Sequence, residues 1–184
     1  VTPAALRSAR HIPLREGLPE DAAIALLREL DGDGHLGLRA APEDDLRRAV
    51  QLTQGIPRAL EILAGILDRD PTLTLAELLA DEAVFGAQVM EGLIAAGYAR
   101  LGDEERRVME ALAIFNRPID ATAIAFLLQP WFPALDVRAS LRRLVNSYFV
   151  TFNRTTGEYS LHPLDREYVY RRIPDEVGEE DADE

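Results

Sequence analysis

The chain has 184 residues, a formal net charge of −12 and no cysteine, which allows one medium domain or two small ones and excludes disulfide frameworks, thiolate catalysis and cysteine-ligated zinc. All 20 basic residues are arginine, so the chain has neither the lysine of a Walker-type phosphate loop nor a Schiff-base lysine. The three histidines, His11, His35 and His162, lack the spacing of metal ligands, so we expect no metal site.

The first predicted helix covers residues 18–30. Its apolar residues follow the i, i+3, i+4, i+7 spacing of an amphipathic helix, at Ala23, Leu26, Leu27 and Leu30. A loop rich in glycine and aspartate follows. Asp31 and Asp33 in this loop resemble the start of a calcium loop, but Pro42 stands where the closing glutamate would be, which argues against calcium.

Further helices are expected at 43–54, from residue 57 onward, at 75–80 and at 83–98. Gly55 ends one helix and Pro57 begins the next, the usual positions of these residue types at helix boundaries. The helix from Pro57 is apolar on nearly all sides, counting Ile56 before it, so we expect it at the centre. Residues 18–100 are therefore predicted to form a small helical bundle.

Residues 101–174 are predicted to form a winged-helix domain, so the fold class is mainly α. Helices are expected at 101–115, where Asp103 can cap, at 121–128 behind an Asp120 cap between Ile119 and Ile124, and at 135–147. The segments YFVTF and EYSL, separated by NRTTG, predict a two-stranded β wing. A last helix from Pro163 to residue 172 completes the domain.

The charge is unevenly distributed along the chain. Residues 1–102 contain ten arginines and sixteen carboxylates, residues 103–175 contain ten of each, and residues 176–184 contain six carboxylates and no arginine. Residues 175–184 are therefore expected to form an acidic, disordered tail or linker. Without a signal peptide pattern or a bilayer-length apolar stretch, we expect a cytoplasmic protein with no membrane contact. The first residue is not methionine, which suggests a part of a longer protein.

His162 lies between the second predicted strand and a helix that begins with proline. Taken alone, this position is typical of an ordinary strand-to-helix junction in which the imidazole bonds to nearby backbone. A functional role for His162 requires a partner elsewhere in the chain.

Three segments provide such a context. TQGIPRALEILAGIL, from Thr53, resembles the Gly-x-Pro motif of the first helical domain in STAND nucleotidases, which include the NB-ARC signalling switches. YSLHPLDREYV, from Tyr159, resembles the histidine motif that ends their winged-helix domain, in its bacterial Leu-His-Pro form. RHIPLREGLPEDAAIALL, from Arg10, resembles the connection from their nucleotide-binding domain, so residues 1–17 would be a linker. The three resemblances follow the family's order and cover most of the chain.

The resemblance implies a nucleotide-dependent switch. Gly55 and Pro57 would lie at the bound nucleotide, with Pro57 against the adenine, and His162 would contact the β-phosphate of ADP. This contact would hold the winged-helix domain against an N-terminal nucleotide-binding domain in a closed state. Exchange of ADP for ATP would open the protein and allow homo-oligomerisation, and sensor repeats would follow at the C-terminal side.

The chain departs from the family pattern at two places. Pro163 follows the histidine where the eukaryotic motif has aspartate. The phosphate loop, the magnesium-binding acid and the sensor arginine of the family precede the matched segments, so ADP or ATP binding requires the nucleotide-binding domain. We therefore expect no enzyme activity from this chain alone, and no catalytic constellation is apparent in it.

Two other functions stay open. In a DNA-binding winged helix, Arg138, Arg142 and Arg143 on the helix at 135–147, with Arg154 on the wing, would contact DNA. The zero net charge of this region and the acidic remainder give little long-range attraction for nucleic acid, which argues against nucleic acid as a partner. The third function is a protein-interaction module that does not depend on nucleotide.

Overall fold

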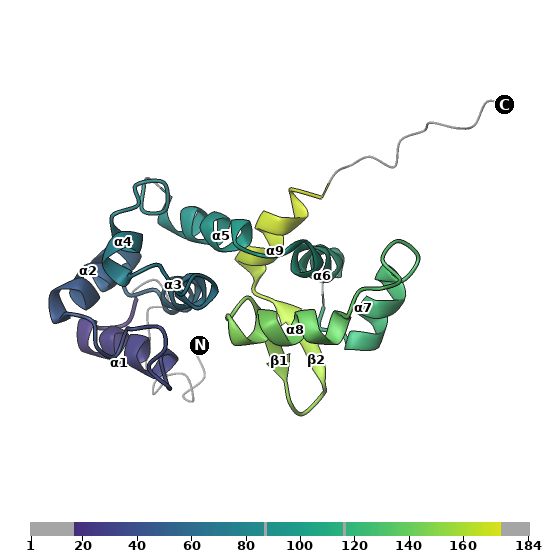
Figure 1. Cartoon of the computed structure of the whole chain (residues 1–184), viewed down its shortest axis with the longest axis horizontal. Helices are drawn as coiled ribbons and strands as arrows, with labels where there is room; N and C mark the ends of the chain where they lie inside the picture. Colours follow the sequence, from purple (N-terminus) through teal and green to yellow (C-terminus); the bar gives the residue numbers. More distant parts are fainter. Residues whose placement is uncertain (1–16, 87, 116, 174–184) are drawn as a thin grey trace, which may run out of the picture.

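The computed structural model describes residues 17–86, 88–115 and 117–173. Figure 1 shows a mainly helical protein with one small sheet near the C-terminal end of the described chain. The first group of helices comprises α1 (Glu20–Leu30), α2 (Glu43–Thr53), α3 (Pro57–Arg69), α4 (Leu75–Leu79) and α5 (Val89–Ala99). The second group comprises α6 (Asp103–Ile114), α7 (Ala121–Leu128), α8 (Val137–Asn146), β1 (Val150–Asn153), β2 (Glu158–Leu161) and α9 (Pro163–Tyr170). The predicted fold class is confirmed.

Helix α3 lies at the centre of the first group, as its apolar sequence predicts. It packs against α1, α2 and α5, and its residues from Ala59 to Leu67, with Glu61 excepted, are buried. The inclusion of Ile56 in this apolar set was wrong. Ile56 precedes the helix as its N-cap residue and is 38% exposed, because its backbone is extended there, with ψ of 117°, and does not continue the helical face.

Helix α5 begins at Val89, six residues later than the sequence predicts. Asp81 explains part of the difference, because its carboxylate accepts a hydrogen bond from the backbone N–H of Ala83 at 2.9 Å and its carbonyl accepts from Val84 at 3.1 Å. These bonds close a turn ahead of the helix, and Val84 is buried there. Apolar spacing alone does not distinguish this turn from a helical one.

The second group has the order of a winged helix. Strands β1 and β2 pair antiparallel, with Val150 opposite Leu161 and Asn153 opposite Glu158. Asp120 caps α7 as predicted, accepting from the backbone N–H groups of Thr122 at 2.7 Å and Ala123 at 3.0 Å. The predicted cap at Asp103 was wrong.

Gly102 is the N-cap residue of α6, and the Glu105 side chain accepts from its backbone N–H at 3.0 Å. A carboxylate at the third helical position reaches back to this N–H in the manner of a capping box, which leaves Asp103 as the first helical residue.

The two groups of helices share an interface. Helix α9 packs against α6 of its own group and also against α5 of the first group (Figure 1). The aromatic ring of Phe149, which is 1% exposed, fills the space between α3 and α5: a Cβ atom built on Gly97 would lie 2.4 Å from its Cζ atom. Gly65 approaches as closely, because its Cβ would lie 2.2 Å from the carbonyl oxygen of Ser147. The small residues Gly65 and Gly97 therefore permit close contact between the first and the second group of helices.

Residues 1–16 of the predicted linker at 1–17, and the acidic segment from residue 175, lie outside the described residues. Among the described residues, the helices are too short or too polar to cross a membrane.

Candidate functional site

The Gly-x-Pro turn between α2 and α3 is built around Gly55. This residue is buried and has φ of +65°, a left-handed conformation that favours glycine. Its N–H donates to the carbonyl of Val50 at 2.9 Å, and its own carbonyl accepts from the N–H of Leu18 at 2.8 Å. Pro57 follows as the first residue of α3, and it is exposed.

The segment before α1 crosses this turn at backbone contact. A Cβ atom on Gly55 would lie 2.5 Å from the carbonyl oxygen of Leu18, and one on Gly17 would lie 1.9 Å from the carbonyl oxygen of Gln54. Both glycines are therefore required by the crossing. The sequence predicted Gly55 as a helix terminator and, by the resemblance, as a residue at the nucleotide, and it predicted no role for Gly17. A contact between distant backbone segments leaves no local periodicity, so neither role in the crossing could be predicted.

His162 is the N-cap residue of α9. Its Nδ1 atom accepts a hydrogen bond from the backbone N–H of Leu164 at 3.3 Å. A backbone N–H can only donate, so Nδ1 is the acceptor in this contact. His162 is half-buried, and its other ring nitrogen, Nε2, forms no hydrogen bond among the described residues.

The turns that contain the two motifs are joined by a buried ion pair. Arg58, directly after Pro57, forms a hydrogen-bonded salt bridge with Asp165, three residues after His162. The side chains of Arg58 and Asp165 are 10% and 0% exposed. Sequence reasoning missed this pair, because the two residues are separated by 107 positions.

Arg58 also anchors the turn between α8 and β1. Its Nη1 atom donates to the carbonyl of Tyr148 at 2.7 Å and to Glu61 at 3.0 Å. Tyr148 has a left-handed φ of +62°, and its hydroxyl donates to the carbonyl of Leu30, at the end of α1, at 3.0 Å. The backbone of this turn is thus held by contacts to the first group of helices at both ends of Tyr148.

Burial raises the pKa of Asp165, and the charge and the hydrogen bond of Arg58 oppose this rise. One carboxylate oxygen, Oδ1, and the Nε atom of Arg58 are buried without a hydrogen-bond partner among the described residues. Burial thus has a larger effect on the pKa of this carboxyl group than its pairing with Arg58 has.

A cleft of about 440 Å³ lies where the two motif segments meet. Its wall includes Ile56, between Gly55 and Pro57, and Leu164, two residues after His162, together with the start of α5. Gly55, Pro57 and His162 themselves do not line it. The structure therefore brings the two segments to one cleft while the predicted contact residues lie at its margin.

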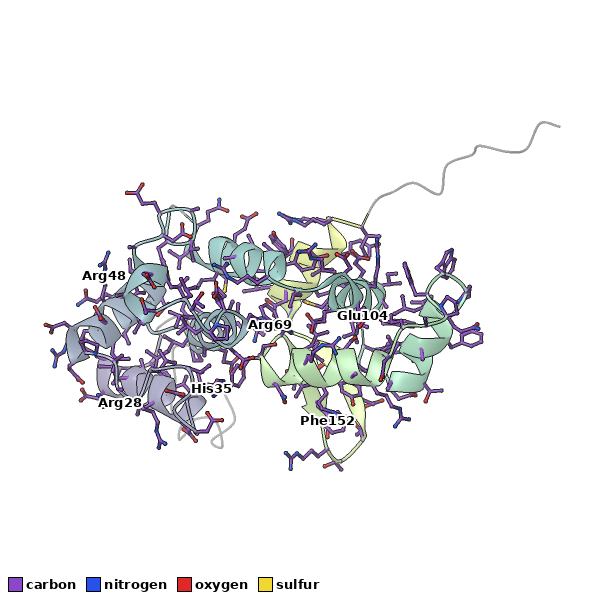
Figure 2. All side chains as sticks on the ribbon, viewed as in Figure 1. Arg28, His35, Arg48, Arg69, Glu104 and Phe152 are labelled. Atoms are coloured by element: carbon purple, nitrogen blue, oxygen red, sulfur yellow. The ribbon has the colours of Figure 1, made fainter. Side chains whose placement is uncertain are left out.

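A second ion-pair network joins α3 to α6 and α8. Both carboxylate oxygens of Glu105 accept from Arg69, at 2.8 and 2.7 Å, and one accepts from Arg143 at 2.7 Å. Burial would raise the pKa of Glu105, but the hydrogen bonds from Arg69 and Arg143 outweigh it, and the pKa is lowered. Figure 2 shows Arg69 near the middle of the molecule, between the first group of helices and Glu104 of the second group.

The four arginines considered for DNA binding have different surroundings. Arg143 is held by Glu104 at 3.1 Å and by Glu105, so it is already neutralised. Arg138 and Arg142 are exposed and line a concavity of about 740 Å³ beside the wing residue Phe152, which Figure 2 shows on the sheet. Arg154 is exposed in the turn between the strands. Only two of the four are brought together.

The loop after α1 gathers Asp31, Asp33 and His35, whose potential ligand atoms lie within 4.8 Å of one another. Both oxygens of Asp31 already accept backbone N–H groups, from Leu36 and Arg39, each at 2.9 Å. His35 contacts Asp33 and, through Nε2, Asp68 at 2.9 Å. These bonds give Asp31 a role in shaping the loop.

A scan against protein-family models found no matching family, and a search of curated proteins found no match.

Proposed function

We propose that this chain is the helical and winged-helix regulatory portion of a STAND-type signal-transduction NTPase, acting in the cytoplasm. It helps to hold ADP in a closed state, together with an N-terminal nucleotide-binding domain in the same protein. Exchange of ADP for ATP opens the assembly and leads to homo-oligomerisation, and C-terminal sensor repeats control the exchange. The chain has no catalytic role of its own.

The observation that carries the proposal is the meeting of the two motif segments. The Gly55–Pro57 turn and the start of α9 are far apart in sequence, yet the Arg58–Asp165 pair ties them and both reach one cleft. Two motifs can contact one nucleotide only if they lie close together. Ligand-binding pockets also occur preferentially at interfaces between structural units. The crossing of Leu18 over Gly55 adds the segment that would lead from the nucleotide-binding domain.

The hydrogen bond of the His162 ring supports its assignment as the phosphate contact. With Nδ1 accepting from Leu164, the other ring nitrogen, Nε2, is left to donate to a phosphate oxygen. A hydrogen bond to a charged group contributes about 1.5–3 kcal/mol, which corresponds to about a tenfold to hundredfold change in a two-state equilibrium. The aspartate that follows the histidine in eukaryotic relatives is replaced by Pro163, and here the backbone of Leu164 orients the imidazole instead.

The test uses the chain joined to the nucleotide-binding domain that the proposal requires. The purified protein is denatured, and released nucleotide is quantified by chromatography, for the wild type, His162→Ala and the control His35→Ala. We expect stoichiometric ADP in the wild type and in the control, and reduced ADP in His162→Ala.

The other outcomes separate the competing functions. Equal ADP in all three proteins would leave His162 as an ordinary junction residue. A wild type that carries no nucleotide and binds none on addition would contradict the switch and favour a nucleotide-independent interaction module. Retarded DNA in a gel shift at low salt, lost in Arg138→Gln/Arg142→Gln, would instead favour a DNA-binding regulator.

A further inference from the structure

A second cavity, of about 230 Å³, lies between the end of α6, strand β2 and the start of α9. Its polar lining residues are Arg117, Arg166 and Ser160, and its apolar ones include Leu112, Phe115 and Leu161. This cavity is separate from the cleft of the proposed function, and their linings share no residue.

The charge of the lining distinguishes this cavity. It contains two guanidinium groups and no carboxylate. By contrast, Glu91 and Glu167 line the 440 Å³ cleft, and Asp120 lines the concavity beside the wing. Among the described residues, neither Arg117 nor Arg166 forms a salt bridge. The lining of the cavity therefore carries a net positive charge, and no described carboxylate forms an ion pair with either arginine.

Arg166 has an unused donor at this place. Its guanidinium lies over the ring of Tyr170, 5.5 Å from the centroid, and its backbone N–H donates to the carbonyl of His162 at 2.9 Å. Its Nε atom is buried and has no acceptor among the described residues. Within the described part of the chain, the guanidinium group of Arg166 therefore has no carboxylate partner, although Arg166 lines the cavity.

We propose that this cavity binds a phosphate group. Guanidinium groups match the geometry of oxyanions and bind phosphate through paired hydrogen bonds, and the Ser160 hydroxyl is a further donor. Two cations without a neighbouring carboxylate favour a doubly charged phosphate over a singly charged carboxylate. The volume lies below the range of about 300–1,000 Å³ for sites of larger ligands, so the ligand is inorganic phosphate or a small phosphate monoester, and a nucleotide is too large.

The experiment follows the arginine Nε–Hε NMR signals of the full chain during titration with inorganic phosphate at constant ionic strength. We expect saturable shifts at Arg166 and Arg117, and only a small drift at Arg138. Arg117→Gln removes an exposed side chain, so the fold is retained, and it should weaken phosphate binding by about tenfold to a hundredfold. The matched control Arg138→Gln should bind phosphate as the wild type does.

Two results would overturn the proposal. One is a linear shift without saturation that is equal at Arg166 and Arg138, or unaltered phosphate binding by Arg117→Gln. The other is acetate binding as tight as that of phosphate, which would mean that the site does not select a doubly charged group. A titration with O-phosphoserine compares the ester with the free ion, and the tighter binder of the two identifies the source of the phosphate. No nucleotide is involved, so this result is independent of the ADP experiment.

Discussion

At the scale of single residues, the Arg58–Asp165 pair is the contact whose removal has the largest expected effect. Both side chains are almost fully buried. Removing one partner of such a pair leaves a buried charge uncompensated and costs about 3–5 kcal/mol. We therefore predict this loss in the free energy of unfolding for Asp165→Leu and for Arg58→Met, measured by urea denaturation. The double variant Arg58→Met/Asp165→Leu should recover most of the loss, because apolar residues of similar size replace a buried pair at little cost.

The exposed pair of Arg171 and Glu167 is the matched control. Its side chains are 71% and 56% exposed, and such surface pairs contribute about 0–1 kcal/mol. Glu167→Gln should therefore have a small effect. Two single variants at Arg58 and Asp165 whose losses simply add in the double variant would contradict the assignment of a coupled pair.

A second residue-scale prediction concerns pH. Hydrogen bonds to Asp33 and Asp68 raise the pKa of His35 from 6.5 to about 9. Because the pKa in the folded protein is above the ordinary value, the imidazolium contacts stabilise the fold fully below pH 6.5, and this contribution is lost as pH rises through about 9. The stability difference between wild type and His35→Gln should therefore be larger at the lower pH and disappear above the higher one.

Urea denaturation of the wild type and His35→Gln across this pH range measures the difference in their free energies of unfolding. The contributions of other titrating groups are the same in both proteins and cancel. High salt should reduce this stability difference, since His35 is about half exposed and its charge is therefore screened. A difference that stays constant with pH would show that His35 contributes through packing alone.

At the scale of elements, the segment at Leu18 crosses the Gly55 turn, and the cost of a clash at this crossing can be measured separately from the cost of backbone strain. Gly34 provides the comparison, because it has φ of +83° and no atom within 4 Å of an added Cβ. Gly34→Ala should cost only the strain of a left-handed alanine, about 1 kcal/mol. Gly55→Ala adds a clash with the Leu18 backbone and should be clearly more destabilising in thermal unfolding. Equal losses at the two positions would contradict a tight crossing.

Most elements could be predicted from the sequence, since apolar spacing and cap residues are local signals. Asp120 and Pro57 marked helix starts that the structure has. The start of α5 and the N-cap residue of α6 were predicted wrongly. There the deciding groups are the Asp81 and Glu105 side chains, which bond backbone N–H groups in place of the expected pattern.

The candidate site also has features that local sequence predicts and features that it does not. The positions of Gly55, Pro57 and His162 at turns and helix starts followed from local sequence. The Arg58–Asp165 pair and the glycine at position 17 did not, because both depend on contacts between segments that are distant in sequence.

At the scale of the whole molecule, the shared interface predicts that the two groups of helices unfold together. Phe149 is buried against α5, and Arg69 bridges to Glu105 and Ser147. Native-state hydrogen exchange should therefore report the same free energy of opening, within about 1 kcal/mol, for amides of α3 and of α6. An opening that exposes α6 to α9 while α3 stays protected would instead show two independent domains.

The central claim is that His162 binds the β-phosphate of ADP and thereby holds the closed state. The most direct measurement is the rate at which a fluorescent ADP analogue leaves the chain joined to its nucleotide-binding domain, for the wild type and His162→Ala. We predict release about tenfold to a hundredfold faster in His162→Ala, with His35→Ala unchanged. Equal release rates in the wild type and His162→Ala would contradict the claim.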